Sequence, residues 1–167
     1  DERFGGGFLN PDLLRSQPTE AAWRGVRPER QSLKAQGGKS GPLLAPEVKI
    51  IAAEPEQADD AYRSFKAGHI IADDAPETIA DGLKVPLKDL TWHFVKNHVT
   101  DILTASEQEI VDAMKITWKY LRVVMEPSCA VPLATILKNP DVFRGKRVGV
   151  VITGGNVDLD KLPWLKG

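Results

Sequence analysis

Cysteine and histidine are scarce in this sequence, and their scarcity removes several kinds of site. Cys129 is the single cysteine among 167 residues, so no internal disulfide can form, and alone it cannot hold a zinc ion. The histidines are His69, His93 and His98, and the last two miss the i, i+4 spacing of a helical zinc site. We therefore expect a reduced, cytoplasmic protein whose histidines lie at the surface or in loops.

No charge of one sign dominates, and no long hydrophobic run is present. Lysine and arginine number 22 against 23 acidic residues, whereas a nucleic-acid binder normally shows a clustered basic face. No apolar run approaches the roughly 18 residues that a membrane helix needs. The first residues, DERF, are acidic where a signal peptide is basic and then apolar. We expect a protein with no nucleic-acid partner and no membrane partner.

Residues 1–45 differ in composition from the rest of the chain. They hold 7 of the 14 glycines and 4 of the 12 prolines, and their apolar residues follow no clear period. Such a segment buries too little apolar surface to offset its ordering entropy, so we expect a largely irregular leader. Its Gly5-Gly6-Gly7 run has the composition of an anion-binding nest, but such a loop normally follows a strand.

Residues 46–167 carry the patterns of a folded domain. Ser106 and Glu109 form a capping-box sequence ahead of a helical stripe of apolar residues. The run 147–152 is rich in β-branched residues and predicts a strand buried on both faces. Alternating elements favour an α/β fold with an open, mostly parallel sheet and flanking helices. The expected strands are 48–53, 101–105 and 147–152, and the expected helices are 58–67, 90–99, 107–122 and 128–137.

Acidic residues gather at the exit of the first expected strand. Glu54, Glu56, Asp59 and Asp60 fall within seven positions, and carboxylate and carbonyl oxygens are the ligands that Mg²⁺ and Ca²⁺ prefer. The other interpretation is a solvated acidic turn that stabilises the positive end of the following helix. Spacing alone leaves both open.

A glycine-rich turn follows the last expected strand. Open α/β sheets bind ligands at the carboxyl ends of their strands, and paired glycines let a backbone approach a ligand closely. Thr153 would present a hydroxyl there, beside Gly154, Gly155 and Asn156. A simple tight turn leaving the sheet fits the same residues.

The stretch from Glu126 to Cys129 marks a loop-to-helix junction. Ser128 can cap the helix, and Glu126 is either a functional carboxylate or a partner of the helix dipole. Cys129 fits a small core residue better than a nucleophile, since no histidine lies near it in the sequence.

These pieces, in this order, resemble the carboxyl-terminal half of the serine racemase and threonine/serine dehydratase family. That family comprises pyridoxal-phosphate enzymes of the tryptophan-synthase β-like fold, also called fold type II. The resemblance covers residues 46–164. It rests on AEPE with ADDAY (53–56 and 58–62), ETIADGL (77–83), residues 104–110, EPS (126–128) and TGGNVDL (153–159).

The resemblance implies a divalent cation, Mg²⁺ or Ca²⁺, and a ligand set for it. The family's site uses a glutamate, the backbone carbonyl of an alanine four positions on, and an aspartate two positions beyond. These positions match Glu54, Ala58 and Asp60.

The resemblance also implies a pyridoxal 5′-phosphate site. Thr153 matches the residue that hydrogen-bonds the pyridine nitrogen, and Gly154 and Asn156 complete that cofactor-binding turn. Glu126 matches a carboxylate near the cofactor ring. The substrate-side loop falls on Asp81 and Gly82. In the racemase branch the asparagine of this turn also touches a nucleotide effector, so the resemblance makes Asn156 a candidate for that contact.

Several parts of the family pattern are absent. We find no Schiff-base lysine in its family context, no Ser-Ser-Gly-Asn loop and no tetraglycine loop, and residues 30–39 read RQSLKAQGGK where the tetraglycine is due. Ser64-Phe65-Lys66 has the letters of the active-site signature, but its position is the helix after the cation site. We therefore expect no catalytic lysine in this chain.

The resemblance implies an ammonia-lyase, or dehydratase, that converts L-threonine, L-serine or 3-hydroxyaspartate to a 2-oxo acid and ammonia. We expect the chain to be a fragment of such an enzyme that is inactive alone, because covalent catalysis needs its nucleophile. Its expected partners are the amino-acid substrate and either a second copy or a complementary lysine-bearing chain. The alternatives are one piece of a split enzyme and a non-catalytic cation-binding α/β module.

Overall fold

A parallel pair of strands forms the centre of the described structure, a computed structural model in which residues 47–72 and 75–165 are described. Strand β1 (Ile51–Pro55) pairs with β2 (Asp101–Ala105), with Ile51 opposite Asp101 and Pro55 opposite Ala105. The α/β class is as predicted and β2 has the predicted bounds, whereas β1 begins at Ile51 and ends at Pro55 instead of spanning 48–53. The hypotheses about residues 1–45, including Gly5-Gly6-Gly7 and the stretch 30–39, lie outside the described residues.

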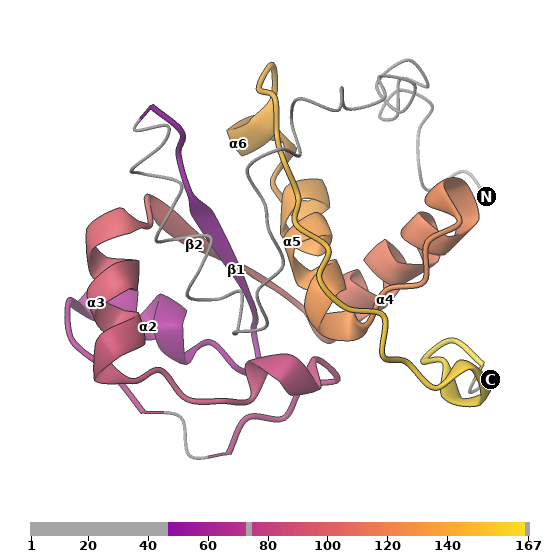
Figure 1. Cartoon of the computed structure of the whole chain (residues 1–167), viewed down its shortest axis with the longest axis horizontal. Coiled ribbons are helices and arrows are strands. Elements are labelled where there is room, and N and C mark those ends of the chain that lie inside the picture. Colours follow the sequence, from indigo (N-terminus) through magenta and orange to yellow (C-terminus); the bar gives the residue numbers. More distant parts are fainter. Residues whose placement is uncertain (1–46, 73–74, 166–167) are drawn as a thin grey trace. The chain divides into compact units, whose positions relative to one another are not determined.

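Two helices connect the strands. Helix α2 (Asp60–Ala67) ends at Gly68, whose φ of 79° only glycine adopts without strain and whose N–H bonds the carbonyl of Ser64. A short 3-10 helix, η3 (Asp81–Leu83), and helix α3 (Asp89–His98) follow before β2. Helices α2 and α3 lie on one side of the strand pair and α5 lies on the other (Figure 1).

The second half of the fold begins with helix α4 (Glu107–Ile116), which continues as the π-helical turn η4 (Thr117–Leu121). The predicted capping box is present, since Ser106 and Glu109 each accept the other's backbone N–H. Helix α5 (Pro127–Lys138), the short α6 (Pro140–Phe143) and the 3-10 turn η5 (Leu159–Lys161) complete the described elements. None of the described helices is long and apolar enough to cross a membrane.

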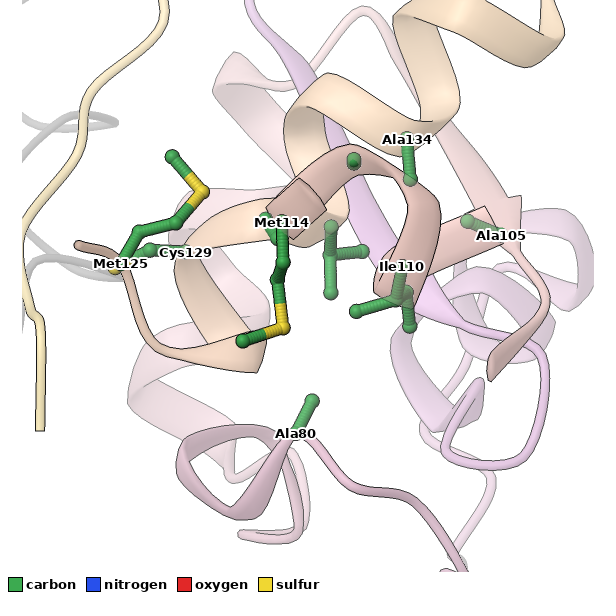
Figure 2. Packing of buried hydrophobic residues seen from close by; sticks show 10 residues of the cluster. Ala80, Ala105, Ile110, Met114, Met125, Cys129 and Ala134 are labelled. Carbon is green, nitrogen blue, oxygen red and sulfur yellow. The ribbon is translucent and has the colours of Figure 1, made fainter. Parts of the chain in front are cut away.

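A core of mostly small side chains joins α4, α5 and β2. Ile110 and Ala130 are fully buried, and the small residues let the two helices approach closely. Figure 2 shows Met125 and Cys129 at one end of this cluster and Ala105 and Ala134 at the other. The core therefore reaches from the strand pair to the first turn of α5.

The prediction of a buried strand at 147–152 is wrong for this structure. In the described residues this run belongs to no sheet, and Val148, Val151 and Ile152 are 44%, 65% and 41% exposed. A β-branched run becomes a buried strand only when a neighbouring strand takes its backbone hydrogen bonds. The sheet formed by the described residues contains β1 and β2 alone, so this neighbour is lacking.

One ionic cluster ties the loop after β1 to the two core helices. Lys138 Nζ lies 2.6 Å from Glu56 Oε1 and 3.0 Å from Glu109 Oε2. The hydrogen bond to Glu56 raises the pKa of Lys138 above 10.5, assisted by Glu109. Burial acts to raise the pKa of Glu109, but hydrogen bonds from Ser106 and Lys138 outweigh it and hold that pKa below 4.5.

The Glu109 charge should make stability fall in acid. Because the folded-state pKa is depressed, its contribution is present above the unfolded value of 4.5 and disappears as the pH falls through the folded value. Glu109→Gln removes the charge while keeping a residue type that suits the capping box. We expect urea unfolding between pH 7 and pH 3 to show a weaker pH dependence in this variant, with Asp112→Asn on the same helix as the control. Equal slopes in the wild type and Glu109→Gln would contradict the assignment.

Candidate functional site

Three separate segments of the chain meet around a cavity of about 240 Å³. Its lining comes from the η3 segment, the first turn of α5 and the turn after residue 152, and consists of Ile79, Asp81, Gly82, Glu126, Pro127, Ser128 and Asn156. The Ile79 N–H donates to Glu107 Oε2 at 2.8 Å, and Glu107 opens α4 directly after β2. This contact places the η3 segment near the carboxyl end of the strand pair, where α/β folds bind ligands.

Side chains of the first turn of α5 hold both of the other segments. The Gly82 N–H donates to Ser128 Oγ at 3.0 Å, and the Asn156 N–H donates to Glu126 Oε2 at 3.1 Å. Cys129 Sγ accepts the N–H of Gly154 at 3.1 Å and the N–H of Thr153 at 3.4 Å. The two loops are thus fastened to one rigid helix end through backbone donors.

Three glycines lie where the loops press against this turn. A Cβ on Gly154 would lie 2.6 Å from the Glu126 carboxylate, and one on Gly82 would lie 2.9 Å from Ser128 Oγ. A Cβ on Gly155 would lie 2.9 Å from the backbone oxygen of Val124. The Gly155 contact alone is with backbone, which cannot move aside as the side chains of Glu126 and Ser128 can, so glycine is required at position 155.

Most residues predicted for cofactor and substrate lie together. Asp81, Gly82, Glu126 and Asn156 line the same cavity, although the first two are far from the others in sequence. Asp81 also pairs with Lys84 at 3.0 Å and is largely exposed.

The positions of Thr153 and of the residues at the start of α5 differ in detail from the prediction. Thr153 does not line the cavity, and its Oγ1 lies 3.4 Å from Cys129 Sγ. Glu126 is the N-cap residue of α5 and Ser128 lies inside the helix, where its hydroxyl binds Gly82 instead of capping. The contacts of Ser128 and Cys129 were missed because both depend on loops more than 20 residues away, and no local pattern signals them.

Lys66 lies apart from the cavity. Its Nζ is 3.1 Å from Asp101 Oδ1, at the first residue of β2, and rests near the Tyr62 ring. The cavity segment instead contacts Glu107, beyond the last residue of that strand. Among the described residues, no lysine lines the cavity.

The expected cation ligands lie together at the end of β1. Glu54, Ala58 and Asp60 are 5%, 1% and 4% exposed. Glu54 Oε2 accepts the N–H of Tyr62 at 2.8 Å, and Asp60 Oδ2 accepts the N–H of Leu87 at 2.6 Å. No group of three or more acidic, histidine or cysteine side chains suited to a metal occurs in the described residues. The expected ligand set contains only two such side chains, Glu54 and Asp60, because its third ligand is the backbone carbonyl of Ala58.

Comparison with known proteins identifies the chemistry with which this arrangement is associated. A family model described as "Pyridoxal-phosphate dependent enzyme" matches residues 33–154. The chain is 82% identical over 121 residues to a β-hydroxyaspartate dehydratase of Paracoccus denitrificans, covering 72% of this chain and 38% of that protein. It is 47% identical over 124 residues to a serine racemase of Arabidopsis thaliana, covering 71% and 38%.

A solved structure matches the fold as well. Maize serine racemase superposes with a TM-score of 0.70 at 40% identity, covering 75% of this chain and 40% of that chain. The parallel strand pair with its flanking helices therefore belongs to the fold of these enzymes. The chain spans about 38% of the length of the curated relatives it matches.

Gly155, next to the cavity residue Asn156, should tolerate no side chain. Gly155→Ala forces a Cβ against the backbone oxygen of Val124, and overpacking of this kind costs about 1–3 kcal/mol. Gly149→Ala is the matched control, because its added Cβ would meet nothing within 4 Å. We expect urea unfolding to show a loss in the first variant and a change within about 0.5 kcal/mol in the second. Equal stabilities of the two variants would show that the close approach is absent in solution.

Proposed function

Because the chain belongs to the family of pyridoxal-phosphate dependent enzymes, we propose that it forms one wall of the active site of an ammonia-lyase. The proposed substrates are 3-hydroxy amino acids, namely 3-hydroxyaspartate, L-threonine or L-serine, and the products are a 2-oxo acid and ammonia. The convergence of Asp81, Gly82, Glu126 and Asn156 on one cavity carries the proposal. The high identity to a β-hydroxyaspartate dehydratase supports 3-hydroxyaspartate, and the identity to serine racemases keeps serine in the set.

The residues present fit pyridoxal 5′-phosphate on one side. When bound, this cofactor withdraws electrons from the α-carbon of an amino acid. A Cβ on Gly154 would displace the Glu126 carboxylate, so the glycine keeps this side of the site open and the carboxylate in place. In this proposal, the Thr153 hydroxyl serves the ring nitrogen, and a neutral hydroxyl there favours elimination over transamination. Asn156 and Glu126 border the ring.

The substrate side of the site falls to the η3 segment. Gly82 lacks a side chain, and its N–H is fixed on Ser128, so the backbone beside the cavity is held at a set distance from α5. Asp81 presents a carboxylate at the rim and is paired with Lys84. In this proposal the two residues orient the amino acid and limit its size.

In this proposal the nucleophile is a lysine that lies outside the described lining of the cavity. The described residues line the cavity with two carboxylates, a hydroxyl and an amide but no lysine. Its 240 Å³ is smaller than the roughly 300–1,000 Å³ of ordinary ligand sites. The exposed Val148, Val151 and Ile152 support contact with further protein. We propose that the contacting protein is a lysine-bearing part of the same enzyme, which belongs either to this chain or to another chain. The alternative is a second copy of this chain.

The purified chain should bind the cofactor without a covalent bond and should not catalyse ammonia release. We expect purified chain mixed with pyridoxal phosphate to show no specific aldimine after borohydride reduction and peptide mapping, because no lysine lines the cavity among the described residues. Ammonia release from 3-hydroxyaspartate, threonine and serine should equal the rate with free cofactor. A lysine trapped at one position, such as Lys66, or catalysed ammonia release would contradict this assignment.

A cation site is the second part of the proposal. Glu54 and Asp60 are buried carboxylates, and buried carboxylates are normally paired or bound to metal. With the Ala58 carbonyl they offer three oxygen ligands, which water would complete for Mg²⁺ or Ca²⁺. The ion would fix the start of α2 on the end of β1.

Cation binding should stabilise the folded chain. At a cation concentration of one hundred times Kd, the free energy of unfolding should rise by about 2.7 kcal/mol, measured by urea titration with CaCl₂ or MgCl₂. Asp60→Asn should abolish this rise, whereas Asp59→Asn should keep it, because Asp59 pairs with Arg63 outside the proposed ligand set. The same rise in both variants, or none in the wild type, would exclude the site.

A further inference from the structure

We infer that Cys129 is a positioning residue that holds the Thr153 hydroxyl as a hydrogen-bond donor toward a bound ligand. The sulfur lies at one end of the core, 5% exposed, and touches the turn that follows residue 152 in three places. The inference deepens the proposed function and rests on it for the identity of the ligand group, the ring nitrogen of the cofactor.

The argument depends on the number of bonds that a neutral thiol can make. A thiol sulfur donates one hydrogen and has two lone pairs to accept others. The N–H groups of Thr153 and Gly154, at 3.4 and 3.1 Å, take both accepting positions. The third contact, 3.4 Å to Thr153 Oγ1, is then made with the S–H as donor.

This direction of bonding decides what the Thr153 hydroxyl does. When its oxygen accepts from Cys129, its own hydrogen is free to donate to something else. In the part of the chain that the structure describes, Thr153 Oγ1 has no other hydrogen-bond partner, and the residue is exposed. The hydroxyl is therefore prepared to donate to an unprotonated acceptor on a ligand. The opposite direction of bonding would leave the S–H without an acceptor.

The buried sulfur also fixes the backbone of the turn. Its two accepted N–H bonds belong to consecutive residues, so the side chain determines both the position of Thr153 and the direction of Gly154. Since Cys129 lies in the first turn of α5, the hydroxyl is placed relative to the same helix end that carries Glu126 and Ser128.

The S–H stretching band tests the inference without any cofactor. Cys129 is the single cysteine of the chain, so one infrared S–H band reports on it alone. We expect a band shifted to lower frequency in the wild type, and a shift to higher frequency in Thr153→Val, which removes the acceptor. Thr135→Val is the matched control on α5 and should leave the band unchanged, because the Thr135 hydroxyl bonds the Pro132 carbonyl. An unchanged band in Thr153→Val, or no S–H band in the wild type, would overturn the inference.

Amide hydrogen exchange provides a second readout. Cys129→Ala should increase exchange at Thr153 and Gly154 about fivefold, as expected for one lost hydrogen bond, and Cys129→Ser should restore part of the protection. A general loss of stability would raise exchange across α4 and α5 as well. Equal exchange at both amides in all three proteins would contradict the inference. The borohydride experiment fails or succeeds independently of these results, so the two proposals are separable.

Discussion

The site depends on one interaction set: side chains in the first turn of α5 accept backbone N–H groups from two distant loops. The Ser128 hydroxyl accepts the N–H of Gly82, and the Glu126 carboxylate accepts the N–H of Asn156. The Cys129 sulfur accepts the N–H groups of Thr153 and Gly154. Each hydrogen bond contributes about 0.5–1.5 kcal/mol to stability, and together these bonds fix the position of both loops against the start of α5. Because the same helix packs in the core through Ala130 and Val131, the stability of the core fixes the geometry of the cavity.

This arrangement explains why the cavity carries polar groups in fixed positions but is only part of a site. The described residues provide carboxylates, a hydroxyl and an amide at the carboxyl end of a parallel strand pair. They provide neither a lysine at the cavity nor a strand beside residues 147–152. In the proposed function, further protein completes both the sheet and the site. The relatives that this chain matches are longer and contain such additional protein.

Local signals in the sequence predicted much of this fold. Ser106 with Glu109 identified the start of α4, the helix expected at 58–67 ends at the same residue as α2, and the order of motifs indicated the family. The prediction of a strand at 147–152 failed for a physical reason. A β-branched run indicates that a segment suits a buried strand, but it does not show whether a neighbouring strand is present to pair with it. The sulfur contacts of Cys129 were equally unpredictable, since they join residues 24 and 25 positions apart through a turn without periodicity.

Reconstitution tests the central claim most directly. The purified chain would be mixed with the separately produced part of the Paracoccus denitrificans β-hydroxyaspartate dehydratase that lies outside the matched 121 residues. Ammonia release from 3-hydroxyaspartate would then be measured with pyridoxal phosphate present. The account predicts release by the mixture and by neither component alone. Release by this chain alone, or an inactive mixture in which the two parts form a stable complex, would contradict it.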